Sequence, residues 1–209
     1  MNTPVPNFRD QRRERIIQVA REVFYEVGYA GASMSMISTR LGGSKATLYA
    51  YFNSKEELFE AIIRESCEAM QAIVHAHIGT NDLRQSLSVV AREMLSMILS
   101  DWGNRTLQLV IEESHRNPDL GRVFNETIER HGKSTMLTML KTAHDKGQIT
   151  APDSVEAAMI LKSLLFGDLQ FKRILNVCPA PDEATLIRHI DRAIDVFMTY
   201  YECKAEANA

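Results

Sequence analysis

Apolar residues recur along most of this chain every three or four positions, the spacing of an α-helix, and glycines interrupt the pattern. In segment 10–27, which Gly28 ends as a left-handed helix terminus would, this face consists of Ile16, Ala20, Val23, Phe24 and Val27. The same signals predict helices over 54–78, 83–100, 102–116 and 118–146, one from Asp153 to about Arg173, and a last one ending near Tyr201. Because no segment longer than a few residues alternates like a strand, the chain is predicted to be all-α, with about nine helices.

The composition excludes several classes of protein. Hydrophobic residues make up 45% of the chain and charged residues 24%, as in ordinary globular proteins. No apolar run approaches the roughly 18 residues of a membrane helix, and the first residues lack the apolar stretch of a secretory signal. The scattered cysteines Cys67, Cys178 and Cys203 fit a reducing compartment. We therefore expect a cytoplasmic protein without a membrane partner.

Motifs of enzymes and metal sites are missing from the sequence. It has no G-x-S-x-G, no phosphate-binding glycine loop and no H-E-x-x-H. The six histidines show no shared ligand spacing. We expect no enzymatic activity, no metal and no cofactor.

The charge is unevenly divided along the chain. Residues 1–55 carry eight Lys and Arg against four acidic residues, a balance of +4, while the remainder has a balance of −7. A basic head on an acidic body suggests that the head meets an anion.

Three short helices follow one another inside about 45 residues, and Gly42 and Gly43 form a tight turn between the second and the third. Such a pair is typical of a helix-turn-helix, whose second helix enters the major groove of DNA. Ser33 and Ser44 are the expected caps of the two helices. The second helix of the pair is predicted over 44–52.

Within 44–52, Leu48 and Phe52 are predicted to face inward, so the outward side chains are Lys45, Ala46, Thr47, Tyr49 and Tyr51. Small residues at its start let this helix approach base edges. The hydroxyls of Ser44, Thr47 and the tyrosines suit phosphates, and Lys45 can reach a guanine or a phosphate. Lys55, in the first turn of the next helix, opposes the helix dipole, and an anion in front of it would explain this placement.

The segment from Arg15 to Ile63 resembles the signature of the TetR family of bacterial regulators almost from end to end. The matching elements are A-x-x-x-F, G-Y, S-M-x-x-I, G-x-S-K-x-T-L-Y-x-Y-F and S-K-E-E-L, and together they cover about a quarter of the chain. Two residues depart from the pattern. Ser38 stands where the family usually has Ala, and Gly43 stands where it usually has Val, which removes a packing side chain from the turn.

This resemblance implies a bacterial protein with a DNA-binding domain at 9–55, its helix-turn-helix at about 33–52, and a ligand-sensing and dimerisation domain at 56–203. The helix 54–78 joins the two. The positions that match DNA contacts in the family are Ser44, Lys45, Thr47, Tyr49 and Lys55. Ser33 and Ser35 match positions that contact the DNA backbone. For Ser33, a role as a helix cap alone is the alternative.

The second domain is rich in methionine, which suits an adaptable pocket for an apolar ligand, although ordinary core packing is the alternative. The residues expected to line such a pocket are Met70, Val74, Met94, Met97, Trp102, Met136 and Met139.

The last helix shows a heptad pattern, which predicts that two copies of the chain pair through it. Its seam would consist of Ile187, Ile190, Ile194, Phe197 and Tyr201. The preceding helix would add Ala158, Leu161 and Leu165 to a four-helix interface.

The predicted function is that of a homodimeric repressor, which a small, mostly apolar inducer releases from a palindromic operator in double-stranded DNA. Two alternatives remain open. One is a small-molecule-binding protein whose head no longer binds DNA. The other is a constitutive or activating DNA-binding regulator without an inducer.

Overall fold

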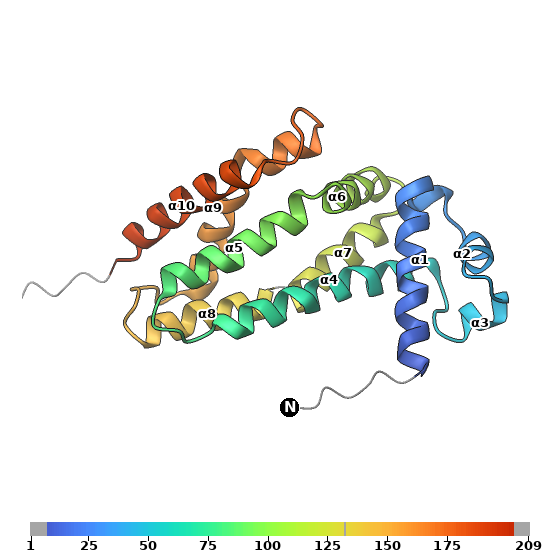
Figure 1. The fold of residues 1–209 in the computed structure, drawn as a ribbon, viewed down its shortest axis with the longest axis horizontal. Helices are drawn as coiled ribbons and strands as arrows, with labels where there is room; N and C mark the ends of the chain where they lie inside the picture. Colours follow the sequence, from blue (N-terminus) through green and yellow to red (C-terminus); the bar gives the residue numbers. More distant parts are fainter. Residues whose placement is uncertain (1–7, 132, 203–209) are drawn as a thin grey trace, which may run out of the picture. The chain divides into compact units, whose positions relative to one another are not determined.

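A computed structural model describes residues 8–131 and 133–202 of the chain (Figure 1). These residues form helices and no strand, which confirms the all-α prediction. The helices are α1 (Phe8–Gly31), α2 (Met34–Arg40), α3 (Lys45–Tyr49), α4 (Lys55–His77), α5 (Leu83–Leu99), α6 (Asp101–Ser114), α7 (Pro118–His131), α8 (Lys133–Asp145), α9 (Ser154–Ile174) and α10 (Glu183–Tyr200). One difference from the predicted elements is at 118–146, which holds the two helices α7 and α8.

The chain divides into two compact units. The first is Met1–Ser66 with Gln108–Ile128, and the second is Cys67–Leu107 with Glu129–Ala209. Helix α4 therefore contributes residues to both units. The domain boundary at residue 55 and the linking role of helix 54–78 stay predictions.

Helix α1 contributes a set of buried side chains to the first unit: Ile16, Ile17, Val19, Ala20, Val23, Phe24 and Tyr29. Gly28 has the positive φ that was predicted for it (+73°), but it marks a kink inside α1 and not the predicted end of the helix, which continues to Gly31. The predicted inward residue Val27 is instead 42% exposed, because Tyr29 beyond the kink fills the core. The Tyr29 ring lies 5.4 Å from that of Phe24 and 5.6 Å from that of Phe59.

The second unit is built around α5, α8, α9 and α10, whose contacts join α10 to α5 and α9, and α9 to α5 and α8 (Figure 1). Helix α9 is kinked at Gly167, where φ is +39°. The imidazole Nε2 of His189 on α10 lies 2.8 Å from the main-chain oxygen of Leu165, just before the kink. This contact fixes α10 against the kinked part of α9.

A buried cation also ties this unit together. Arg173 on α9 is only 7% exposed. Its Nε donates to the Leu99 oxygen at 3.0 Å, and its Nη2 lies 2.6 Å from the Asp101 carboxylate. Its Nη1 points to the Cys178 oxygen at 3.5 Å. The guanidinium therefore links the end of α5, the start of α6 and the loop between α9 and α10.

No helix among the described residues is long and apolar enough to cross a membrane.

Candidate nucleic-acid interface

Helix α2 begins as the sequence predicts. Ser33 has extended backbone angles, and its hydroxyl accepts a hydrogen bond from the Met36 amide at 3.2 Å, which makes it the N-cap. Ser35 is exposed in the first turn of the helix. The unusual Ser38 is buried, and its hydroxyl donates to the Ser35 oxygen at 2.9 Å, so it needs no other partner.

The turn between α2 and α3 uses both glycines, for different reasons. Gly42 has a φ of +69°, which strongly favours glycine. Gly43 has no such φ, but a Cβ atom there would lie 3.1 Å from Nη2 of Arg12 on α1. The Arg12 guanidinium thus lies directly beside the turn. A side chain at position 43 would leave less room for it.

Helix α3 is shorter than predicted: it spans Lys45–Tyr49 rather than 44–52, and Ala50 is its C-cap. The predicted N-cap Ser44 is confirmed, since its hydroxyl accepts from the Thr47 amide at 3.1 Å and lies 3.0 Å from the Thr47 hydroxyl. Leu48 and Phe52 are both buried, as predicted. Phe52 lies beyond the end of α3 and is covered by the guanidinium of Arg13, 5.2 Å from the ring centre.

Burial of Leu48 and Phe52 leaves the predicted DNA-contacting side chains at the surface. Lys45, Ala46 and Tyr49 are exposed, while Thr47 and Tyr51 are half-buried. Together with Ser33, Ser35 and Ser44 they form one candidate surface, which we call the α2–α3 face. That these residues contact DNA stays a prediction.

Lys55 has a structural role that the sequence did not reveal. Its Nζ donates to the main-chain oxygens of Tyr29 at 2.7 Å and Ala32 at 3.2 Å. It also lies 4.1 Å from the centre of the Tyr29 ring. Carbonyl oxygens just after the kink in α1 therefore account for a lysine at the start of α4, and no external anion is needed to explain it. A phosphate contact by Lys55 stays a prediction.

Tyr29 itself is held from its other end by Glu56. The Tyr29 hydroxyl donates to the Glu56 carboxylate at 2.9 Å. Burial, followed by this hydrogen bond, raises the pKa of Tyr29 above its ordinary value. Burial also acts to raise the pKa of Glu56, but its hydrogen bonds outweigh that effect, so its pKa is lowered. At neutral pH the Tyr29 phenol therefore stays protonated and the Glu56 carboxyl stays ionised. Their hydrogen bond joins α1 to α4 in that state.

From the sequence, Arg12 and Arg13 were only two of the basic residues of the head. In the structure Arg12 lies beside the turn and Arg13 lies over Phe52, both next to α3. The sequence signal for Arg12 was the departure at Gly43, since a missing side chain in a turn leaves room for another group.

The predicted ligand-binding residues only partly come together. Met70, Val74, Met94, Met136 and Met139 contribute to one apolar core of the second unit, whereas Met97 and Trp102 are half-buried and lie outside that cluster. Their role as a ligand pocket stays a prediction.

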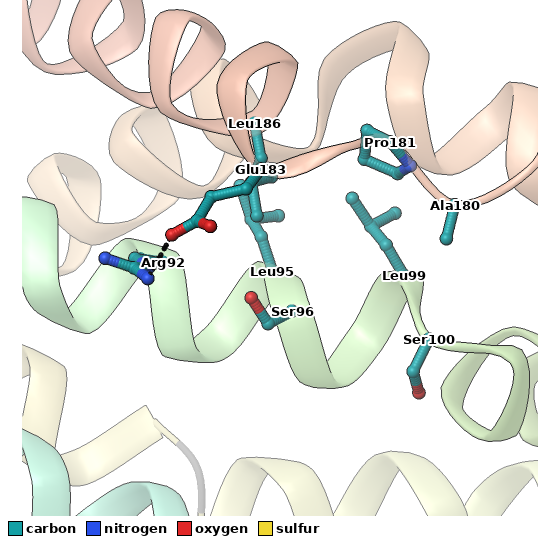
Figure 2. A pocket seen from close by; sticks show the side chains of 9 residues that line it. All are labelled: Arg92, Leu95, Ser96, Leu99, Ser100, Ala180, Pro181, Glu183 and Leu186. Carbon is teal, nitrogen blue, oxygen red and sulfur yellow. Dashed lines mark hydrogen bonds and ion pairs between the residues drawn. The ribbon is translucent and has the colours of Figure 1, made fainter.

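A cavity that the structure describes lies elsewhere in the second unit and has a volume of about 310 Å³ (Figure 2). It is lined by Arg92, Leu95, Ser96, Leu99, Ser100, Ala180, Pro181, Glu183 and Leu186. None of these residues was predicted from the sequence, because α5 and the residues before α10 meet only in the folded unit.

The predicted dimer seam needs correction at most of its residues. The core of the single protomer buries Leu161, Leu165, Ile190, Ile194, Phe197 and Tyr201. Ala158 is half-buried and Ile187 is 39% exposed. The heptad pattern thus reflects packing within one chain, since a core-facing and a partner-facing stripe have nearly the same period.

Other apolar side chains on the same two helices are exposed. They are Val155, Met159 and Phe171 on α9, with Leu175 at its end, and Ile187, Val196 and Tyr200 on α10. We call them the α9–α10 apolar set.

The described residues contain no group of three or more His, Cys, Asp or Glu placed to hold a metal ion.

Two family models match the chain. Residues 16–62 match the bacterial regulatory proteins of the tetR family, and residues 85–203 match the C-terminal domain of AefR-like transcriptional repressors. The first match extends beyond the predicted boundary at residue 55, and the second lies within the predicted second domain, 56–203.

Curated relatives include both transcriptional activators and transcriptional repressors. The transcriptional activator FasR of Mycolicibacterium smegmatis is 32% identical over 51% of this chain, a match that spans about half (48%) of FasR. The transcriptional regulator UidR of Escherichia coli K12 is 31% identical over 73% of this chain and 76% of its own length. Among solved structures, the flavonoid-responsive regulator FrrA is 28% identical, with a TM-score of 0.72 over 93% of this chain and 99% of FrrA.

Proposed function

The chain belongs to the TetR family of DNA-binding transcriptional regulators, and from this premise we propose that it is a homodimeric repressor, which a small, mostly apolar ligand releases from a palindromic operator. The observation that carries the DNA-binding part is the arrangement of α3. Its inward residue Leu48 is buried, its N-cap Ser44 is formed, and Lys45 and Tyr49 are exposed. Such a helix is preorganised to enter a major groove.

The contacts on the α2–α3 face divide by chemistry. Ser33, Ser35, Ser44 and Tyr49 present hydroxyls suited to phosphates. Lys45 and Ala46, at the start of α3, are the residues best placed to meet base edges, because a lysine can donate to guanine and an alanine leaves room for close approach. Thr47 and Tyr51 would complete the surface.

The longer family match supports a repressor and not an activator. AefR-like repressors match 119 residues, 85–203, of this chain, whereas the activator FasR aligns over 51% of it. Activation without an inducer is therefore the second candidate.

A second copy of this chain is the partner that best suits the α9–α10 apolar set. Met159, Phe171 and Tyr200 are each 60% exposed or more, on two consecutive helices of the unit. Exposed apolar side chains in such numbers mark an interaction surface. A twofold pairing of α9 and α10 would cover them and would present two DNA-binding heads to two half-sites.

An inducer would bind in the second unit, where the methionine-containing core supplies adaptable apolar contacts. The description of FrrA as flavonoid-responsive supports a small organic ligand for a chain of this kind. Helix α4 supports the coupling, because the helix that begins at Lys55 in the first unit ends at His77 in the second. A tenfold loss of operator affinity requires only about 1.4 kcal/mol.

The test is a binding titration of the full-length protein with the DNA directly upstream of its own gene, with and without candidate apolar ligands. We expect a saturable complex of two protomers per site that such ligands dissociate. Lys45→Ala is expected to change the sequence preference and so to reduce the discrimination between this DNA and a scrambled duplex. No complex with any upstream DNA would favour a ligand-binding protein without DNA-binding activity, and a complex that no ligand alters would favour the constitutive regulator.

A further inference from the structure

Helix α3 is too short to keep its position by itself. It spans five residues, Lys45–Tyr49, which is less than two helical turns, and helices of this length are marginal in isolation. The chain then turns tightly, since the amides of Tyr51 and Phe52 both donate to the oxygen of Leu48 at 3.0 Å. The direction in which α3 presents its side chains therefore depends on the groups that hold its two ends.

Two buried side chains anchor α3. Leu48 lies in the helix and Phe52 follows its end, and both are almost completely buried. The hydrogen bond between the Phe52 amide and the Leu48 oxygen joins these anchors through the main chain. A displacement of the Phe52 ring would therefore change the orientation of the helix and of its exposed residues Lys45 and Tyr49.

Adjacent arginines of α1 lie near the two ends of α3. Arg12 lies beside Gly43 in the turn before the helix, where an added Cβ would be 3.1 Å from its Nη2 atom. Arg13 lies at the other end, with its Cζ atom 5.2 Å from the centre of the Phe52 ring. Both arginines are half-buried. Arg12 therefore has the main chain of a turn beside it, whereas Arg13 has an aromatic ring.

We propose that Arg13 is a positioning residue for DNA recognition, which holds α3 through Phe52 in the orientation that reading base edges requires. A planar guanidinium over an aromatic ring is attracted to it electrostatically and covers its face. The inference rests on the proposed function, because it concerns the helix that is proposed to enter the major groove. It separates Arg13 from Arg12, whose expected partner is a phosphate.

A positioning residue and a phosphate contact differ in their effect on DNA binding. Specific binding needs contacts with base edges, whereas non-specific binding relies on the charge of the phosphates. A poorly oriented α3 therefore weakens specific binding and spares non-specific binding. Loss of a phosphate contact weakens both and lowers the salt dependence. Partial unfolding of the head also weakens both, so the ratio of the two affinities identifies a positioning role.

The experiment measures binding of full-length Arg13→Met by fluorescence anisotropy at several salt concentrations. The two probes are the DNA directly upstream of the protein's own gene and a scrambled duplex. We expect the ratio of the two affinities to fall by about tenfold, a change of about 1.4 kcal/mol. The salt dependence of non-specific binding should stay as in the wild type.

Helix α1 offers a matched control for the loss of charge. Arg15 lies two residues beyond Arg13, is exposed, and bonds to Gln18 at 3.0 Å. Arg15→Met should leave the affinity ratio unchanged. Phe52→Leu removes the ring but keeps an apolar anchor, and in that background Arg13→Met should cause no further fall, because the two residues act through one contact.

Amide hydrogen exchange tests the hold on α3 without DNA. The amides of Leu48 and Phe52 donate to the oxygens of Ser44 and Leu48, so they should be protected in the wild type. Arg13→Met is expected to raise their exchange rates above those of Arg15→Met. Amides in the middle of α1 should exchange equally in both variants, which would show that the head remains folded.

Equal exchange of the Phe52 amide in Arg13→Met and Arg15→Met would overturn the proposal. An unchanged affinity ratio would overturn it as well. A salt slope lowered by about one per head would make Arg13 a phosphate contact instead. If the wild type forms no specific complex with any upstream DNA, the proposed function is contradicted, and the exchange rates still decide whether Arg13 holds α3.

Discussion

The Nζ atom of Lys55 donates a hydrogen bond to the main-chain oxygen of Tyr29 over 2.7 Å. The cation at the start of α4 is thus engaged within the head before any DNA is present, and a second bond, to the Ala32 oxygen, strengthens this attachment. Lys45, by contrast, is exposed on α3. The two lysines are therefore expected to differ in what their loss does to the protein.

Lys55→Ala is expected to lower the free energy of unfolding by about 2 kcal/mol, since hydrogen bonds to a charged group are lost. It should also weaken binding to all DNA sequences alike and reduce the salt dependence by about one counterion per head. Lys45→Ala should change sequence preference with no loss of stability. Chemical denaturation and salt-dependent fluorescence anisotropy separate these effects. A destabilised Lys55→Ala protein with an unchanged salt slope would limit Lys55 to its structural role.

Arg12 is expected to act as a further phosphate contact, because its guanidinium lies beside the turn that precedes α3. Arg12→Ala should reduce the salt slope of operator binding by about one per head. Gly43→Val should have a similar but smaller effect, since even its Cβ would come within 3.1 Å of Arg12 Nη2 and displace the end of a flexible side chain.

The double variant tests whether the two residues act together. If Gly43 matters through Arg12, Gly43→Val should add nothing in the Arg12→Ala background. Arg15→Ala is the control, since Arg15 is an exposed residue of the same helix that bonds to Gln18. An additive double variant would mean that Gly43 acts on the turn itself.

Met159→Glu and Phe171→Glu should dissociate the dimer, because each places a charge in the α9–α10 apolar set at a side chain that is about 60% exposed in the protomer. Light scattering should then give a mass near the 23.6 kDa of one chain. Ile111→Glu is the matched control, at an exposed apolar residue of the first unit. An unchanged mass in both α9 variants would exclude this face as the interface.

Tyr201→Phe is expected to stabilise the protein by about 1 kcal/mol. The Tyr201 hydroxyl is buried, and among the described residues it has no hydrogen-bond partner. Its burial also raises the pKa of this phenol. Replacing a buried unpaired hydroxyl by hydrogen removes a desolvation cost, which calorimetry should register as a higher Tm. Tyr200→Phe, at an exposed neighbour, should have no effect. A lower Tm for Tyr201→Phe would reveal a partner for its hydroxyl.

The first unit should lose stability in alkaline solution through Tyr29. Its pKa is raised in the folded state, so the contribution is fully present below the unfolded value of about 10 and is lost as the pH rises beyond it. The expected slope is about 1.4 kcal/mol per pH unit. Tyr29→Phe should be less stable at neutral pH but should lack this slope, whereas Tyr49→Phe, at an exposed site, should retain it. Urea denaturation between pH 9 and 11 provides the measurement, and parallel curves for wild type and Tyr29→Phe would rule out this role.

Local features of the first unit could be predicted from the sequence because each depends on neighbouring residues. The left-handed Gly28, the caps Ser33 and Ser44, and the inward Leu48 are all set within one or two helical turns. The roles of Lys55 and Arg12 could not be predicted, since their contacts join residues 26 and 31 positions apart. Such contacts follow from tertiary packing.

The last helix shows a different limit. Ile190, Ile194 and Phe197 repeat at three- and four-residue intervals, and a sequence cannot distinguish whether such a stripe faces its own core or a second chain. Only the folded unit shows that the stripe is internal and that the side chains free to meet a partner lie elsewhere on α10. The cavity beside Arg92 was unpredictable for the same reason, since its two walls are about 90 residues apart in the sequence.

The contact between His189 and the Leu165 oxygen has a consequence for how two copies meet. It joins α10 to α9 just before the kink at Gly167, within a single chain. The part of α9 after the kink is held separately, through Arg173 and its contacts with Leu99 and Asp101, so the apolar side chains on both sides of the kink are in place in each protomer before association. In the proposed dimer two copies would meet as preorganised surfaces, so that dimerisation would not bear the conformational entropy of arranging the four helices.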